Sequence, residues 1–323
     1  MTMRGPCGWL LFAGVVLHAA SGAAQAYPGR SIRLVVPYAP GSTTDTLARL
    51  LGTKLTAALG QQVVIDNRAG AAGNIGTDIV AKAAADGYTL AVVPGSHAIN
   101  PSLYAKLPFD PVRDFATVAL IGSAPLLIAA HPAVAASSMR ELIALAKAKP
   151  GEIRYASGGS GSPSHLSMEL LKSMAGIELA HVPYKGGGSV LTALLSAEVQ
   201  LTPSGALVLL PLARAGRIKL IATTGAKRLA VLPEVATVAE SGVPGYVVTG
   251  WWGMLAPAGT PKPIVQLLNG EIARALQSAD LRERLAADGI EAAGGTPDAF
   301  AQHLRREIVL WSKVVRDSGA RAE

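Results

Sequence analysis

The sequence has 323 residues, of which 50% are hydrophobic and 16% are charged, a composition that excludes a disordered chain. Lys and Arg number 29 against 22 Asp and Glu, but the cations are dispersed and no basic run is interleaved with aromatic residues, which argues against a nucleic-acid partner. The length is sufficient for about two domains, each with its own core.

The N-terminal residues have the pattern of a secretory signal peptide. Arg4 precedes an apolar stretch over residues 9–20, and residues 24–26 (AQA) match the small-x-small cleavage pattern. We expect cleavage after Ala26, a mature chain that begins at Tyr27, and a periplasmic location; a retained N-terminal anchor is the alternative. Cys7 is the only cysteine and lies inside this signal, so the mature chain has no thiol for a disulfide, a metal or a nucleophile.

The stretch 32–45, IRLVVPYAPGSTTD, predicts a strand, a glycine turn and the start of a helix over 44–59. Such a turn directs backbone N–H groups and the positive end of the helix dipole at whatever lies above it. No Lys or Arg occurs between Val35 and Ala48. An anion at this turn would therefore be held by backbone and hydroxyl groups.

The next elements predict a parallel β-α-β-α-β unit. Strands are expected over 62–67 and 90–93, with a helix over 75–84 between them. Ligand sites of such sheets lie at the C-terminal ends of the strands, where the opening turn and the loop 94–97 would meet. The Pro-rich residues 100–115 predict an irregular connector.

A second unit repeats this pattern in kind. A capped helix ending near Gly151 precedes a strand over 153–156, the glycine/serine turn 157–165 (SGGSGSPSH) and a helix. Again no Lys or Arg occurs between Tyr155 and Leu171. Further elements are strands over 179–182, 199–202 and 218–223 and a helix over 190–197.

Two apolar runs, 126–130 and 246–251, are interpreted as strands that cross between two α/β domains. They predict an inserted domain over 126–250 and an outer domain built from 27–125 and 251–323, after a signal peptide over 1–26. The outer domain would be completed by a strand over 254–256 and helices over 263–276, 281–287 and 297–316. A cleft between such domains is a common ligand site.

The sequence contains no familiar catalytic, nucleotide or metal motif. Ser160 or Ser162 beside His165 departs from the G-x-S-x-G pattern, which disfavours a serine hydrolase. No Walker sequence or dinucleotide fingerprint is present and the histidines are scattered, so neither a cofactor nor a metal is expected. Asp45 could act as a base, but its place in the first helical turn favours a capping role.

Three residues keep two interpretations each. Lys185 either reaches a ligand carboxylate or is a solvated loop charge. Trp251 and Trp252 either line the cleft or pack between the domains.

Short motifs in a fixed order cover essentially the whole mature chain: Tyr27-Pro28, VVPYAPG at 35–41, NRAG at 67–70, DGYTL at 86–90, HVPYKG at 181–186, APAGTP at 256–261 and Trp311. In these motifs the chain resembles the Bug family, extracytoplasmic solute-binding proteins associated with tripartite tricarboxylate transporters. The resemblance implies a fold like that of type II periplasmic binding proteins, with two α/β domains around a ligand cleft and two crossing strands.

The same resemblance implies a function. The protein would be a monomeric receptor rather than an enzyme. It would capture a small carboxylate (a di- or tricarboxylate, an aromatic acid or an acidic amino acid) and deliver it to the membrane permease subunits. A sensor that presents the bound carboxylate to a signalling receptor is the alternative.

The resemblance also implies the ligand contacts. The first turn would contribute Tyr38, Ala39, Gly41, Ser42, Thr43, Thr44 and Asp45. The second turn would contribute Ser157, Gly158, Gly161, Ser162 and His165. The distal end of the ligand would meet Ser96, Pro203, Ser204 and Trp252. Three departures leave the ligand open. Ser42 stands where the family usually has a second glycine, and Gln200 replaces a frequent Asp. Ser189, Val190 and Ala193 stand where the family usually has Pro-Ala and an Asp in the next helix.

Overall fold

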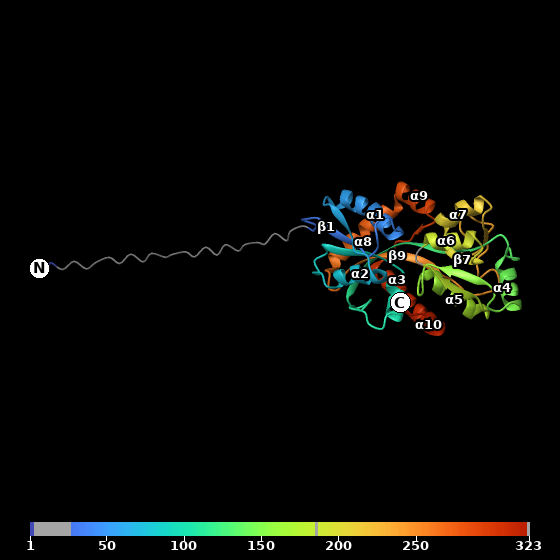
Figure 1. Cartoon of the computed structure of the whole chain (residues 1–323). Helices are drawn as coiled ribbons and strands as arrows, with labels where there is room; N and C mark the ends of the chain where they lie inside the picture. Colours follow the sequence, from blue (N-terminus) through green and yellow to red (C-terminus); the bar gives the residue numbers. More distant parts are fainter. Residues whose placement is uncertain (3–26, 185–186, 322–323) are drawn as a thin grey trace.

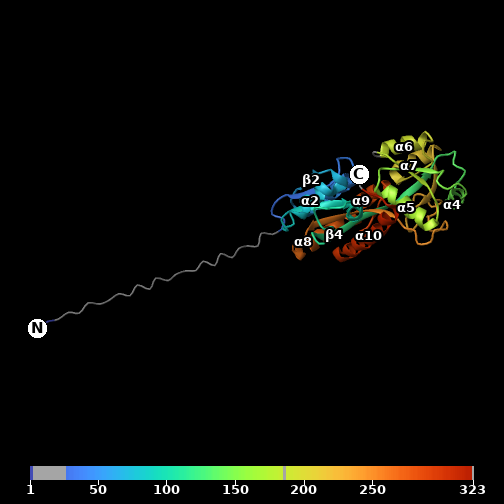
Figure 2. The same ribbon diagram turned by 60° about the horizontal axis from the view of Figure 1, so that its bottom comes forward.

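The computed structural model describes residues 1–2, 27–184 and 187–321, so the predicted signal segment and Lys185 lie outside the described residues. Two groups of helices and strands lie side by side and are joined by β4, β9 and α10 (Figure 1). In the turned view, β2, α2 and α8 lie at one end and α4, α5, α6 and α7 at the other (Figure 2). Among the described residues, no helix is both long and apolar enough to cross a bilayer.

The first half of the molecule combines the start and the end of the chain. Its N-terminal elements are β1 (Ile32–Val36), α1 (Thr43–Leu59), β2 (Val63–Asn67), η1 (Ala71–Gly73), α2 (Asn74–Ala81), β3 (Thr89–Pro94) and α3 (Ser96–Leu103). Its C-terminal elements are β9 (Thr249–Pro257), α8 (Lys262–Gln277), α9 (Ala279–Ala287), β10 (Glu291–Ala292) and α10 (Pro297–Ser318). The parallel arrangement expected for the first unit is confirmed, because β1 pairs in parallel with both β2 and β3.

The second half is built from the middle of the chain. Its elements are α4 (Met139–Ala148), β5 (Arg154–Ser157), α5 (Pro163–Ala175), β6 (Ala180–Pro183), α6 (Gly187–Leu195), β7 (Leu201–Gly205), α7 (Ala206–Arg214) and β8 (Lys219–Thr223). β5 pairs in parallel with β6 and β7. The second unit therefore repeats the local architecture of the first.

One long strand, β4 (Phe115–Ala130), takes part in both sheet regions. Residues up to Pro125 pair antiparallel with β9, and residues from Leu126 onward pair with β7 and β8. The strand order is β2-β1-β3-β9-β4-β7-β5-β6. The chain thus has the α/β fold with two crossing strands that was expected.

Several element boundaries differ from the expectation. The predicted connector 100–115 is wrong at both ends, because α3 continues to Leu103 and β4 already begins at Phe115. The crossing run 246–251 starts three residues too early, because β9 begins at Thr249; its residues 249–251 and the strand expected over 254–256 form this one strand. Helix α7 was missed; it contains Pro211 and follows β7 without a loop.

Gly253 lets the C-terminal helix lie directly on the crossing strand. A Cβ atom at this position of β9 would overlap the ring of Phe300, which projects from α10 and is buried. Contact between the backbone of β9 and an aromatic ring thus fixes α10 against the sheet. This position matters because α10 also contributes to the cavity described below.

We expect Gly253→Ala to lower the free energy of unfolding by about 1–3 kcal/mol, because the added methyl group forces the Phe300 ring or the strand to move. Chemical denaturation followed by circular dichroism measures the change. The matched control is Gly270→Ala inside α8, where a Cβ would meet only the end of Arg274. That variant should be stabilised by up to about 1 kcal/mol, since Ala favours a helix over Gly. Equal stability of the two variants would contradict the packing argument.

Candidate functional site

The first turn is held in shape by the side chain of Asp45. Gly41 has a φ of 81°, a left-handed conformation that favours glycine, and its N–H donates to Asp45 Oδ2 at 2.9 Å. Ser42 caps helix α1, accepting from the Asp45 N–H at 3.2 Å. Asn67 and Arg49 donate to the same carboxylate, each at 3.0 Å. Asp45 therefore has the capping role favoured from the sequence.

These donors decide the protonation of Asp45. Burial alone would raise its pKa, but hydrogen bonds from Arg49, Gly41 and Asn67 outweigh burial and hold the pKa below its ordinary value. The carboxylate is only 3% exposed. It is therefore a structural anion beneath the turn.

The second turn repeats this geometry with a different side chain. Gly161 has a φ of 76°, and its N–H donates to Nδ1 of His165 at 3.0 Å. Ser162 caps helix α5, accepting from the His165 N–H at 3.2 Å. The spacing from glycine to serine to Asp45 or His165 is the same in both turns. The two turns are therefore one structural motif used twice.

This geometry leaves few backbone donors free in either turn. Gly158, Gly159 and Gly161 donate within the second turn. In the described part of the chain, no acceptor is found for the N–H groups of Thr43 and Thr44 at the start of α1 or of Ser164 at the start of α5. Pro163 has no N–H to offer. The helix N-termini thus offer an anion two donors from α1 and one from α5. The loops before them add the N–H groups of Ala39 and Ser160, for which no acceptor is found among the described residues either.

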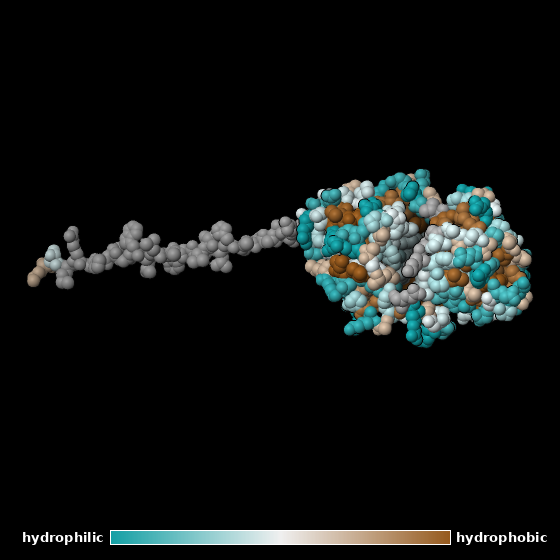
Figure 3. Space-filling view, viewed as in Figure 1, coloured by the Kyte–Doolittle hydropathy of each residue, from teal (hydrophilic) through white to brown (hydrophobic). Residues whose placement is uncertain are grey.

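A cavity of about 390 Å³ lies where the two halves meet. Both helix N-termini reach it, through Thr43 and Thr44 of α1 and Pro163 of α5. The crossing strands contribute Ala124, Pro125 and Leu126 of β4 and residues 249–252 of β9. Its volume is that of a site for a small molecule. On the face seen in Figure 3, apolar residues occur only in small scattered groups, so a large apolar interaction surface is not apparent there.

Hydrogen bonds fix the polar side chains of the cavity wall. Tyr38 donates to the Ala72 carbonyl at 3.0 Å, and its oxygen lies 2.7 Å from the Ser96 hydroxyl. The Trp252 indole N–H donates to the Thr44 hydroxyl at 3.2 Å. These contacts hold the start of α3, at Ser96, and the strand β9, at Trp252, against the first turn.

A stack of three rings supports the second turn from behind. The rings of His165 and His181 are 3.9 Å apart, and the Tyr155 ring lies 4.9 Å from His181. Burial, with the neighbouring His165, lowers the pKa of His181 to about 4, and burial also lowers the pKa of His165. Both imidazoles are therefore neutral at pH 7, and His165 can accept the Gly161 N–H.

The serine hydroxyls near the second turn are used in hydrogen bonds that stabilise the turn. The Ser162 hydroxyl caps α5 and lies 3.0 Å from the Ser164 hydroxyl. Ser157 is fully buried, and its hydroxyl lies 2.6 Å from Nε2 of His181. This Ser–His pair lies behind the second turn and does not line the cavity.

The structure separates the predicted contact residues into two groups. Five line the cavity: Tyr38, Thr43, Thr44, Ser96 and Trp252. The others form the turns or lie beside them and are not part of the cavity wall: Ala39, Gly41, Ser42, Asp45, Ser157, Gly158, Gly161, Ser162, His165, Pro203 and Ser204. Both groups remain predictions with respect to a ligand.

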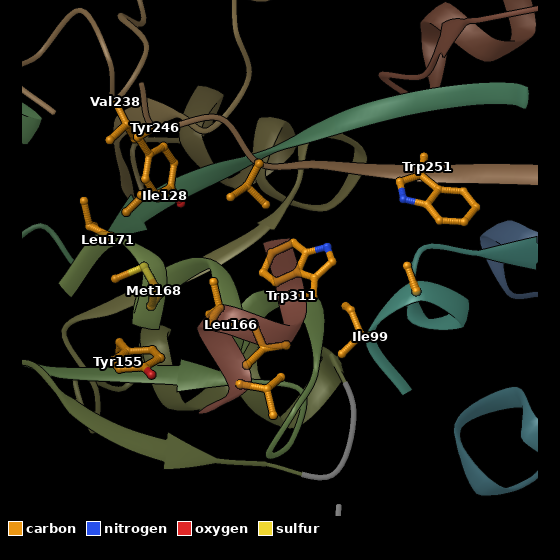
Figure 4. Packing of buried hydrophobic residues seen from close by; sticks show 14 of the residues in the cluster. Ile99, Ile128, Tyr155, Leu166, Met168, Leu171, Val238, Tyr246, Trp251 and Trp311 are labelled. Atoms are coloured by element: carbon orange, nitrogen blue, oxygen red, sulfur yellow. The ribbon is translucent and has the colours of Figure 1, made fainter. Parts of the chain in front are cut away.

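Most residues of the wall were not predicted to lie there, and one of them, Trp251, had two interpretations. Trp251 satisfies both of its interpretations, since it is 1% exposed and also lines the cavity. Glu307 and Trp311 were not predicted to lie there; they come from α10, and the indole N–H groups of Trp251 and Trp311 both donate to Glu307. Figure 4 shows Trp251 on β9, Trp311 on α10 and Ile99 on α3. The only signal in the sequence was the spacing of residues 307 and 311, one helical turn apart.

The described residues contain no group of three or more His, Cys, Asp or Glu side chains placed to hold a metal ion. The polar groups of the cavity are hydroxyls, indoles, backbone amides and one carboxylate. This set is suited to hydrogen bonding with a small polar ligand.

Comparison with known proteins identifies the relatives of the chain. The family model described as "Tripartite tricarboxylate transporter family receptor" matches residues 47–320. Protein BugT of Bordetella pertussis (strain Tohama I) is 39% identical over 305 residues, which are 94% of each chain. The chain belongs to this receptor family. The resemblance to the Bug proteins is thereby confirmed.

Solved structures of family members share the fold. The R. palustris protein Rpa4515, solved with adipate, is 40% identical with a TM-score of 0.80, covering 91% of this chain and 99% of its own. MatC (Rpa3494) from Rhodopseudomonas palustris, solved with malate, is 35% identical with a TM-score of 0.75, covering 90% and 100%. The two-halved architecture is thus that of the family receptors.

We expect Asp45→Asn to lower the free energy of unfolding by about 1–3 kcal/mol at pH 7, because a buried charged acceptor for three donors is lost. Since the pKa of Asp45 is depressed in the folded protein, its contribution is present above the ordinary value of 3.8 and is lost as the pH falls through the folded pKa. The variant should therefore show a smaller loss of stability on acidification than the parent. Urea denaturation between pH 7 and 3 measures both effects.

The control is Asp317→Asn, which removes a half-exposed carboxylate that contacts Lys313 on α10. Its effect should stay within about 0.5 kcal/mol, as for a surface ion pair. A change for Asp45→Asn no larger than that for Asp317→Asn would refute the assigned role.

Proposed function

We propose that this protein is a periplasmic receptor that captures a small organic carboxylate in the cavity between its halves and delivers it to the membrane subunits of a tripartite tricarboxylate transporter. The observation that carries the proposal is the convergence of two helix N-termini, each built from the same glycine-serine turn, on one cavity. The relatives solved with adipate and malate support the ligand class.

The donors of this site are sufficient for the affinity that a receptor needs. A helix N-terminus stabilises an anion by about 0.3–1 kcal/mol when exposed and up to ~2 kcal/mol when partly buried. Charge-assisted hydrogen bonds add roughly 1.5–3 kcal/mol each. Micromolar affinity, about −8 kcal/mol, is reached with the three free N–H groups and the wall hydroxyls once closure excludes water.

Closure of two domains is part of the proposal. One domain would comprise residues 27–125 and 251–323, and the inserted domain residues 126–250. The change of partners of β4 between Pro125 and Leu126 supports the first boundary. The protein would act as a monomer, be exported with cleavage after Ala26, and release its ligand unchanged, without a catalytic step.

A thermal-shift screen tests the ligand class. The purified protein is heated with monocarboxylates, dicarboxylates, tricarboxylates, aromatic acids and acidic amino acids in turn. A ligand that binds only the folded state raises the melting temperature by mass action. No shift with any carboxylate would refute the proposed function.

Thr43→Asp tests the site itself. Thr43 is the first residue of α1, lines the cavity and is exposed. An Asp there should stabilise the helix by about 0.3–1 kcal/mol through the dipole. It should nevertheless weaken carboxylate binding by about tenfold or more, or ~1.4 kcal/mol, because two negative charges then share the site. Calorimetric titration and melting without ligand measure the two effects.

The matched variant is Ala279→Asp, which places the same charge at the exposed first residue of α9, outside the cavity. Its affinity for carboxylates should equal that of the parent. If both variants lose affinity alike, the effect reflects overall charge and the assignment of α1 fails.

A further inference from the structure

Glu307 gives the cavity an unexpected charge. In the described part of the chain, Glu307 is the only acidic residue of the cavity wall, and neither Lys nor Arg lines it. Most other residues of the wall are apolar or aromatic, including Ile99, Leu126 and Val248. The cavity thus contains two helix N-termini, which favour an anion, and also a carboxylate of the protein itself.

Two tryptophans fix this carboxylate in place. The indole N–H of Trp251 donates to Oε2 of Glu307 at 3.1 Å, and that of Trp311 donates to the same oxygen at 2.9 Å. Both indoles are almost completely buried, so the carboxylate is held between β9 and α10. No other hydrogen bond to Glu307 is found among the described residues. Oε1 therefore keeps its capacity to accept a hydrogen bond.

No neighbouring cation offsets Glu307 among the described residues. Glu307 forms no ion pair with a Lys, Arg or His side chain of the described residues. His303, one turn earlier on α10, packs its ring 5.3 Å from that of Trp251. Burial lowers the pKa of His303, although the charge of Glu307 acts in the opposite direction, so this imidazole is neutral at pH 7.

The charge of Glu307 acts on whichever part of the ligand lies beside it. A second ligand carboxylate near Glu307 would meet a like charge in a cavity whose walls are mostly apolar. An ammonium group would instead gain a charge-assisted hydrogen bond to Oε1. The aromatic residues of the wall, Tyr38, Trp251, Trp252 and Trp311, also favour a cation over an anion.

We propose that Glu307 is the specificity-determining residue of the cavity and that it selects a zwitterionic ligand, with a carboxylate at one end and an ammonium or similar cationic nitrogen at the other. The proposal rests on the proposed function for the carboxylate end. It separates this chain from its relative solved with adipate, whose ligand has a carboxylate at both ends.

Two pairs of ligands of matched length test the assignment by calorimetric titration at pH 7. The aliphatic pair is 6-aminohexanoate and adipate, and the aromatic pair is 4-(aminomethyl)benzoate and benzene-1,4-dicarboxylate; hexanoate and benzoate report on the carboxylate end alone. In at least one pair, the parent protein should bind the amino acid about tenfold or more tighter than the diacid. Tighter binding of the diacid in both pairs would overturn the assignment of Glu307 while leaving the carboxylate receptor intact.

Glu307→Gln keeps an oxygen that can accept from the two indoles but removes the charge. The variant should lose about tenfold or more in affinity for the preferred amino acid, gain affinity for the diacid, and bind hexanoate or benzoate as the parent does. The control Glu283→Gln removes the same charge from an exposed position on α9 and should leave every affinity unchanged.

The remaining outcomes are also decisive. An unchanged preference in Glu307→Gln, with an unchanged melting temperature without ligand, would overturn the role of Glu307 alone. If the parent binds none of the six probes but responds to another carboxylate in the thermal-shift screen, the assignment of Glu307 fails alone. No response to any carboxylate refutes the carboxylate function and the assignment of Glu307 together. If the variant does not fold, the preference of the parent between the members of each pair still decides.

Discussion

Thr224 joins the two crossing segments at the point where they pass between the halves. Its N–H donates to the Leu126 carbonyl at 2.9 Å, and its carbonyl accepts from the Val248 N–H at 2.8 Å. Its hydroxyl accepts from the Leu126 N–H at 2.8 Å and donates to the Val248 carbonyl at 2.7 Å. The side chain is fully buried, so these bonds have no competition from water. Leu126 and Val248 both line the cavity, and the same residue therefore fixes part of its wall.

This link constrains how the two halves can move. β4 is continuous through the junction, and Pro125, which has no N–H, is the last residue to pair with β9 before the partners change. Rotation of one half against the other therefore has to be absorbed within a few residues of β4 and β9. The cavity lies at this junction, so a small rotation there would change its width directly.

The turns could be predicted from the sequence because their signals are local. Gly41-Ser42 and Gly161-Ser162 each precede a regular helix, and a glycine turn followed by a capping serine has one common geometry. The hydrogen bonds from Gly41 to Asp45 and from Gly161 to His165 were harder to predict from the sequence. They depend on where a side chain folds back, and they determine which N–H groups stay free.

The crossing strands and the cavity wall were predicted less well, because their signals are tertiary. In Phe115–Pro125, small residues such as Gly122 interrupt the apolar pattern, so the strand is stabilised by pairing with β9 rather than by its own propensity. Glu307 looks like an ordinary residue on a polar helix face until Trp251, distant in sequence, is brought against it. Tertiary contacts, among them the packing of Phe300 on Gly253, determine that this face of α10 meets the cavity.

The two turns are alike in geometry but unlike in what they offer an anion. α1 presents two free N–H groups, from Thr43 and Thr44, above a turn whose buried carboxylate is offset by Arg49. α5 presents one, from Ser164, because its first residue is Pro163, and it replaces the carboxylate with a neutral imidazole. The helix of the first turn thus supplies more free N–H groups, and the second turn supplies a helix dipole above a neutral imidazole rather than a carboxylate. Under the proposed function, a single carboxylate between them would draw on both, which would account for one motif being used twice with different side chains beneath it.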